Sequence, residues 1–184
     1  MNNIQIISQF SSNYPENFLQ LKQPPQVIFA MGNIKLLNSF SVGVVGARVC
    51  TEESKVLTQQ LVEELCLNKI TVVSGMADGI DQIAHETCIL HHGKTIAIIG
   101  SGFDNAKKER IFSKILNNNG LIISEYFPDI PAFKYNFPRR NKLLVALSHA
   151  IVAVETHQKS GTMITAKEAL LQKVPLFTFP RWNS

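Results

Sequence analysis

Nine consecutive residues, 134–142, combine four cationic side chains with two aromatic rings and contain no carboxylate. The segment reads Lys134-Tyr135-Asn136-Phe137-Pro138-Arg139-Arg140-Asn141-Lys142. Ammonium and guanidinium groups bind backbone phosphates, and aromatic faces stack on unpaired bases. A second basic run, Lys107-Lys108-Glu109-Arg110, lies earlier in the chain. The chemistry of residues 134–142 suits a nucleic-acid backbone with stacked bases, and the second run is expected to face the same side of the fold. The alternative for residues 134–142 is a solvated basic turn that precedes a helix.

Short loops of small residues follow four of the apolar runs described below. They are Gly46-Ala47-Arg48, residues 74–79, residues 100–104 and Lys159-Ser160-Gly161-Thr162. Because such loops leave backbone N–H groups free near helix N-termini, four of them at one edge of a sheet would attract phosphate. For any single glycine the alternative is a tight turn or a close helix–strand contact. Arg48 would hold a phosphate bidentately, the alternative being an ion pair with Asp78 or Asp104 that locks the loops together.

The fingerprints of common nucleotide enzymes are missing from the sequence. There is no GxxxxGK[ST] loop, and Gly43-x-x-Gly46 replaces GxGxxG, which disfavours an ATPase or a dinucleotide dehydrogenase. Asp81 and His85 are spaced as two metal ligands on a helix can be, but no third ligand is evident and local hydrogen bonds explain them better. Neither Ser160 nor any cysteine has the setting of a nucleophile. We expect no catalytic residue, no metal and no cofactor.

Strands and helices alternate along the chain and would position these loops. Continuous apolar runs predict strands at 42–45, 70–74, 95–99, 121–124, 150–155 and 175–179. Helical periodicity predicts helices at 52–67, 81–91, 107–117 and 161–172, and another helix that begins at Lys142. This order is typical of an α/β fold with a doubly wound, mostly parallel sheet and helices on both faces. Arg48 and Lys142 are then expected at the same rim.

Length and composition set the remaining limits. The chain has 184 residues, 45% of them hydrophobic, a net charge of +4 and a sequence pI of about 9.0, which suits one domain and a polyanionic partner. The longest nearly apolar stretch, 143–154, is too short to span a bilayer. The N-terminus lacks a signal-peptide pattern. We expect a cytoplasmic protein with no membrane contact.

The loops together resemble the DprA/Smf family (DNA processing protein A). The resemblance rests on Val45-Gly46-Ala47-Arg48, residues 74–81 with His85, residues 100–104, Ser124-Glu125, residues 137–142 and residues 160–166, in that order. It covers residues 13–180 and implies an extended Rossmann-like domain that binds single-stranded DNA without hydrolysis. It also implies that the protein protects incoming single strands in natural transformation, helps load the RecA recombinase and acts as a homodimer.

The resemblance also implies a set of DNA-binding residues. Arg48 and Lys142 would line the DNA pocket, Phe137 and Arg140 belong to the same motif, and Gly46 would let the backbone approach a phosphate. The full expected set is Gly46, Arg48, Lys107, Lys108, Phe137, Arg139, Arg140, Lys142, Ser160, Gly161 and Thr162.

Some positions depart from the family pattern. Ala47 stands where serine is usual, and Lys107-Lys108 replaces a common Tyr-Pro. Residues 1–40 are expected to form a lead-in that packs on the sheet edge, and residues 41–184 the Rossmann-like DNA-binding domain. We expect no C-terminal winged-helix domain, because the sequence stops at Ser184.

Two other functions fit the same topology. The first is a phosphoribohydrolase of the Lonely Guy type, whose hallmark is PGGxGTxxE; here Thr165 stands at the carboxylate position and Glu168 follows one turn later. The second is a nucleotide-sensing module that has lost DNA binding, against which the cations of residues 134–142 argue.

Overall fold

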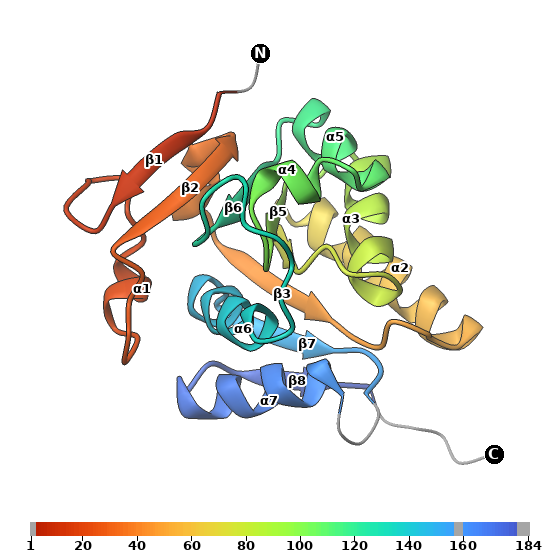
Figure 1. The fold of residues 1–184 in the computed structure, drawn as a ribbon. Coiled ribbons are helices and arrows are strands. Elements are labelled where there is room, and N and C mark those ends of the chain that lie inside the picture. Colours follow the sequence, from red (N-terminus) through yellow and green to blue (C-terminus); the bar gives the residue numbers. More distant parts are fainter. Residues whose placement is uncertain (1–2, 157–159, 180–184) are drawn as a thin grey trace.

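The structure is a computed structural model, which describes residues 3–156 and 160–179. Its described residues form an eight-stranded sheet in the order β1-β2-β6-β5-β4-β3-β7-β8 (Figure 1). The strands are β1 (Gln5–Ser8), β2 (Val27–Gly32), β3 (Ser41–Val45), β4 (Thr71–Ser74), β5 (Thr95–Ile98), β6 (Leu121–Ser124), β7 (Ala150–Ala153) and β8 (Leu176–Thr178). The helices are α1 (Glu16–Leu19), η1 (Ile34–Asn38), α2 (Glu52–Leu67), α3 (Ile80–Leu90), α4 (Phe103–Ala106), α5 (Arg110–Asn117), α6 (Asn136–Leu147) and α7 (Gly161–Leu171).

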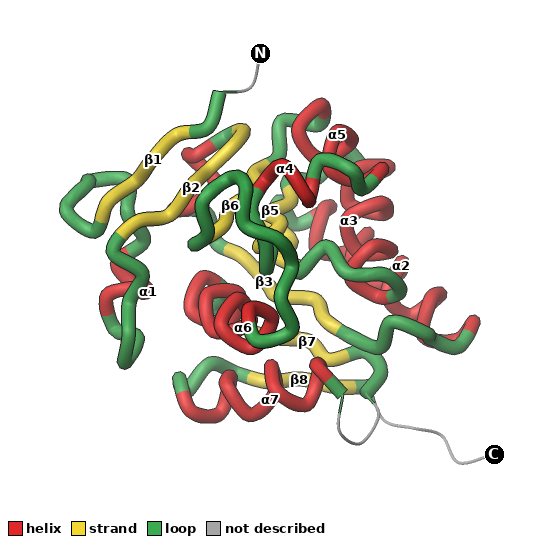
Figure 2. The backbone as a smooth tube through the Cα atoms, viewed as in Figure 1, coloured by secondary structure: helices red, strands yellow, loops and turns green. Residues whose placement is uncertain are grey.

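Strands β3 to β8 are the parallel strands that the apolar runs predict, and the predicted fold class is confirmed. Each of β3, β4, β5 and β6 is buried along its whole length. Helices α2, α3 and α5 cover one face of the sheet, and α6, α7 and α1 cover the other (Figure 2). From β3 the chain builds outward through β4, β5 and β6, and then returns to place β7 on the other side of β3. Ligands of such sheets bind where the strand order reverses, beyond the carboxyl ends of the strands.

The first 40 residues contribute two strands that the sequence patterns do not predict. β1 pairs with β2, and β2 pairs with β6, in both cases antiparallel. The run 27–32 is as apolar as the predicted strands, but the prolines on either side of α1 mask it as part of an irregular lead-in. The division of the chain into a lead-in and a DNA-binding domain stays a prediction.

Helix α6 begins at Asn136, six residues before the start that the sequence predicts. Pro138 does not prevent this, because the first turn of a helix needs no backbone N–H donor. The basic segment is therefore largely helical rather than a loop, and its side chains point in different directions around the helix. The start of α6 at Asn136 therefore decides which cations lie at the rim.

The described part of the chain contains no helix with the length and apolarity needed to cross a bilayer.

Candidate nucleic-acid interface

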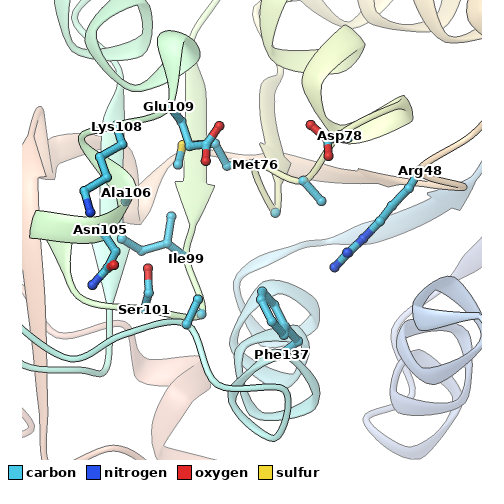
Figure 3. Close-up of a pocket in the computed structure, with 14 residues that line it drawn as sticks. Arg48, Met76, Asp78, Ile99, Ser101, Asn105, Ala106, Lys108, Glu109 and Phe137 are labelled. Atoms are coloured by element: carbon cyan, nitrogen blue, oxygen red, sulfur yellow. The ribbon is translucent and has the colours of Figure 1, made fainter.

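Two adjoining hollows open at the rim formed by the carboxyl ends of the described parallel strands. The switch-point hollow, of about 440 Å³, lies beyond the end of β3, where the strand order reverses between β3 and β7. It is lined mainly by the loop after β3, helix α6 and the start of α7. The β4–β5 hollow, of about 340 Å³, is lined by the loops after those two strands and by α4 (Figure 3). Arg48, Ala77 and Phe137 line both hollows and so mark the ridge between them.

Arg48 is exposed on the loop after β3 and extends toward Phe137 (Figure 3). Its guanidinium carbon lies 5.6 Å from the centroid of the Phe137 ring, within the range of a cation–π contact. Among the described residues it makes no ion pair within 4.0 Å, and Asp104 pairs instead with Lys107 at 3.1 Å. The alternative of a loop-locking ion pair is therefore not observed. The guanidinium is oriented by an aromatic ring and keeps its donors available.

Gly46 has the close-packing role that the sequence offers as the alternative for any single glycine. A Cβ added there would lie 2.7 Å from the Cβ of Ile80, the first residue of α3. The backbone of Ile80 also donates to the Ala47 carbonyl oxygen at 3.2 Å. Gly46 therefore lets α3 pack directly against the loop that carries Arg48, and fixes the position of that loop.

The N-terminus of α7 completes the wall of the switch-point hollow. Ser160 caps the helix by accepting from the Met163 N–H at 3.4 Å, and Gly161 is exposed with open space around its Cα. Asn141 of α6 donates to the Gly161 carbonyl oxygen at 3.4 Å, which ties the two helices together. The N-terminus of this eleven-residue helix borders the hollow, and helix N-termini attract anions. Lys159, which belongs to the same predicted loop, lies outside the described residues.

Arg140 lies beneath the ridge and not on it, with only 5% of its surface exposed. Its Nη1 donates to the Ile98 carbonyl oxygen at 2.8 Å, and its guanidinium carbon lies 5.9 Å from the Phe137 ring centroid. The guanidinium also packs against Gly75, where any Cβ would collide with it. Arg140 lines the switch-point hollow but is largely buried, and it joins α6 to β5 and to the loop after β4. Its expected contact with DNA stays a prediction.

Asp81 and His85 of α3 are buried in the same region. Burial raises the pKa of Asp81, although the facing Arg140 and hydrogen bonds from Ser74 and backbone N–H groups oppose this shift. Burial, helped by the charge of Arg140, lowers the pKa of His85 to about 3. The ring Nδ1 of His85 lies 2.7 Å from the Thr95 hydroxyl, which itself donates to the Val72 carbonyl oxygen. No three His, Cys, Asp or Glu side chains gather as metal ligands within residues 3–156 and 160–179.

The cations of residues 134–142 separate onto two faces of α6. Phe137, Arg140, Asn141 and Leu144 line the switch-point hollow. Arg139 and Lys142 line hollows on the far side, together with Leu21 and Glu168. The predicted placement of Lys142 beside Arg48 is therefore wrong. Its cause is the early start of α6, which puts Lys142 in the middle of the helix and turns it away from the rim.

The second basic run divides in the same way. Lys108 lines the β4–β5 hollow, whereas its neighbour Lys107 is held by Asp104 and lines neither rim hollow. The β4–β5 hollow also contains Asp78, Ser101, Asn105 and Glu109, which were not among the site residues expected from sequence. Asp78 and Ser101 lie in the predicted small-residue loops, and Glu109 lies in the second basic run.

These features define a class of protein: a doubly wound α/β fold with a rim site suited to a phosphate-bearing ligand and an aromatic ring at its centre. Comparison with known proteins identifies the family. Residues 5–184 match the family described as DNA recombination-mediator protein A, and the chain belongs to this family.

Relatives from several bacteria support this assignment. The chain is 32% identical to DNA processing protein DprA of Streptococcus pneumoniae over 169 residues, which cover 91% of this chain and 60% of that protein. It is 33% identical to protein Smf of Escherichia coli over 181 residues, which cover 97% of this chain and 48% of that protein. The chain thus spans about half to three fifths of the length of these relatives.

Solved structures agree with the sequence comparison. The crystal structure of the Streptococcus pneumoniae DprA matches with a TM-score of 0.90 at 31% identity, over 98% of this chain and 64% of that one. DprA of Helicobacter pylori matches with a TM-score of 0.88 at 32% identity, over 100% of this chain and 85% of that one; that structure describes a binding mode for single-stranded DNA. A molybdenum cofactor binding protein of Rippkaea orientalis, at 20% identity and a TM-score of 0.56, shares the fold alone.

Proposed function

We propose that this protein binds single-stranded DNA at the rim, through backbone phosphates and base faces, without catalysing a reaction. The observation that carries the proposal is Arg48, an exposed guanidinium with no acidic partner in the described structure, held against the ring of Phe137. The Helicobacter pylori relative, whose solved structure describes a binding mode for single-stranded DNA, supports it.

The proposed contacts lie in the switch-point hollow and on the ridge beside it. Arg48 and the N-terminus of α7 face the switch-point hollow and suit a phosphate. Phe137, half-buried at the ridge, offers a ring on which an unpaired base can stack. Phosphate contacts and stacking carry little sequence information, and stacking requires a base that is not paired. We therefore propose a preference for single strands over duplexes.

The absence of catalysis is part of the proposal. It rests on the described residues, among which no three His, Cys, Asp or Glu side chains gather as metal ligands. Protection of incoming strands, loading of RecA and action as a homodimer are proposed from family membership.

The phosphoribohydrolase alternative lacks its key carboxylate at the rim. Thr165 lines the switch-point hollow, and its hydroxyl donates to the Gly161 carbonyl oxygen at 3.3 Å. Glu168 faces the far side of α6 and accepts from Gln172 at 2.9 Å. Neither Thr165 nor Glu168 therefore places a carboxylate in the switch-point hollow as the hydrolase motif requires.

Fluorescence anisotropy with a labelled oligo-dT strand and a matched blunt duplex tests the proposal. The single strand should bind more tightly, and log affinity should fall against log salt concentration by about 0.7 for each phosphate contacted. Equal or tighter duplex binding at matched salt would overturn the proposal. Release of adenine from AMP by the same preparation would instead support the hydrolase.

A further inference from the structure

Two of the three cysteines, Cys66 and Cys88, meet between helices α2 and α3. Their sulfur atoms lie 3.6 Å apart, although the residues are 22 positions apart in the sequence. Each lies in the last turn of its helix, and the two helices pack side by side on one face of the sheet (Figure 1). The contact therefore depends on helix packing, and nothing in the sequence indicates it.

The turn after α3 leaves room for the two sulfur atoms. A Cβ added at Gly93 would lie 2.9 Å from the Cys88 Sγ and would collide with the Cys66 Sγ, so the glycine lets the turn close over the pair. The Gly93 N–H donates to the Cys88 carbonyl oxygen at 2.8 Å, and the Cys88 thiol donates to the Lys94 carbonyl oxygen at 3.3 Å. The Cys88 sulfur is thus held in place beside that of Cys66.

The two sulfur atoms differ in their access to solvent. Cys66 is half-buried, whereas Cys88 has no exposed surface. The hydrogen bond with Cys88 lowers the pKa of Cys66, although burial opposes this shift. The contact with Cys66 and burial both raise the pKa of Cys88. The thiolate, which is the form that oxidants attack, therefore forms at Cys66 rather than at Cys88.

We propose that Cys66 and Cys88 form a thiol pair that a hydroperoxide such as hydrogen peroxide converts to an intramolecular disulfide. The Cys66 thiolate attacks one peroxide oxygen and becomes a sulfenic acid; the O–O bond breaks, and the hydroxide that leaves takes up the thiol proton to give water. The Cys88 thiol then attacks the Cys66 sulfur, the S–O bond breaks, and a second water leaves with the proton of Cys88. Two thiols thus lose two electrons, and one hydrogen peroxide is reduced to two waters.

The disulfide would fasten α2 to α3 at the end of α3 that is remote from the rim. The sulfur atoms need to approach from 3.6 Å to about 2.05 Å, and both lie in terminal turns, where helices fray most readily. Because the bond closes a chain segment of 22 positions, it restrains the unfolded state and stabilises the fold. It also protects Cys66 from irreversible oxidation to the sulfinic acid.

This proposal differs from the sequence-based expectation that no cysteine has the setting of a nucleophile. It is also independent of the proposed DNA binding, because neither Cys66 nor Cys88 lines a rim hollow in the described structure. The alternative is that the two thiols only fill space between the helices, as small apolar side chains do.

Treatment of the reduced protein with hydrogen peroxide, followed by alkylation of free thiols and mass spectrometry without reduction, tests the proposal. Trypsin places Cys50, Cys66 and Cys88 on separate peptides, 49–55, 56–69 and 70–94, so the pairing can be assigned directly. One disulfide should form within each chain and link the last two peptides. The melting temperature should rise by about 5–10 °C, and dithiothreitol should reverse both changes.

Substitution of each cysteine separates the roles of the three thiols. Cys66→Ser should form no disulfide and show no rise in melting temperature. Cys88→Ser should instead accumulate a sulfenic acid at Cys66, which dimedone traps. Cys50→Ser is the matched control, because Cys50 lies outside the pair and burial raises its pKa; this variant should keep the disulfide and the rise in melting temperature.

Two results would overturn the proposal. One is that Cys66 and Cys88 both remain free under peroxide treatment that fully oxidises a glutathione control. The other is a disulfide that joins two chains or includes Cys50. Both are read on the unmodified protein, so they hold even where a cysteine variant fails to fold.

Discussion

The two faces of helix α6 carry the same types of residue and are built for different purposes. The rim face presents Phe137 above the buried Arg140, next to the exposed guanidinium of Arg48. The far face presents Arg139 and Lys142, both exposed, beside Glu125 and Glu168. Arg139 and Arg140 are adjacent in sequence, yet one is in solvent and the other in the interior. The function of a cation here depends on its helical face rather than on the charge density of its segment.

Replacing each of these adjacent arginines gives the largest expected effect. Arg140→Met should lower the free energy of unfolding by about 3–5 kcal/mol, because it leaves Asp81 buried without its facing cation and removes the bond to Ile98. Arg139→Met should change it by less than about 0.5 kcal/mol. Urea unfolding curves measure both. Similar losses in the two variants would contradict the distinction between the faces.

The interior behind the rim face should also make stability depend on pH. The pKa of His85 falls from an ordinary 6.5 to about 3, so the unfolded chain takes up a proton in this range and the folded chain does not. The contribution of His85 is therefore present above pH 6.5 and lost as the pH falls, by about 2 kcal/mol between pH 7 and pH 5. Burial also raises the pKa of Asp81, which makes the folded protein more stable as the pH falls. The contribution of His85 is therefore measured as the difference in pH dependence between a His85 variant and the unmodified protein.

Unfolding of His85→Gln at pH 5 and pH 7 measures this contribution. The variant should lose about 2 kcal/mol less than the unmodified protein on acidification. His92→Asn, a change at an exposed histidine just after α3, should leave the pH dependence as it is. An unaltered pH dependence in His85→Gln would contradict a buried neutral histidine.

The aromatic ring of the rim face should matter for binding more than an exposed ring nearby. Phe137→Leu keeps an apolar side chain over Gly100 but removes the stacking surface, and should weaken oligo-dT binding roughly tenfold. Phe133, which stacks on Tyr135 with ring centroids 5.3 Å apart, lines neither rim hollow. Phe133→Leu should leave the affinity nearly unchanged. Equal losses would place the stacked base elsewhere.

Replacing the adjacent lysines before α5 should have the smallest effect on DNA binding. Lys108→Ala should flatten the log–log salt dependence of oligo-dT binding by about 0.7, the value for one phosphate contact. Lys107→Ala should leave the slope unchanged, since Lys107 is paired with Asp104 outside the hollow. Anisotropy titrations at several salt concentrations distinguish the two. A larger change in Lys107→Ala would contradict the placement of these side chains.

The parallel sheet was predictable from sequence because each buried strand is a continuous apolar run. The position of Arg48 at the rim was predictable as well, because it lies in the short loop that follows the central strand β3. The position of Lys142 was not predictable. Each residue along a helix rotates the side chain by about 100°, and Pro138 obscures the sequence signal for the start of α6. Nor could the sequence show that Arg140 is buried, because burial depends on contacts with β5 and the loop after β4 that are distant in the chain.

The most direct test of the central claim is the oligo-dT affinity of Arg48→Ala beside that of Lys142→Ala, measured by anisotropy at several salt concentrations. The two cations were expected from sequence to act alike, and the structure places only Arg48 at the rim. Arg48→Ala should bind about tenfold more weakly and flatten the salt slope by about 0.7, with its melting temperature unchanged. Lys142→Ala should retain both affinity and slope. Equal losses in the two variants, or normal binding by Arg48→Ala, would contradict a DNA site at the rim of the sheet.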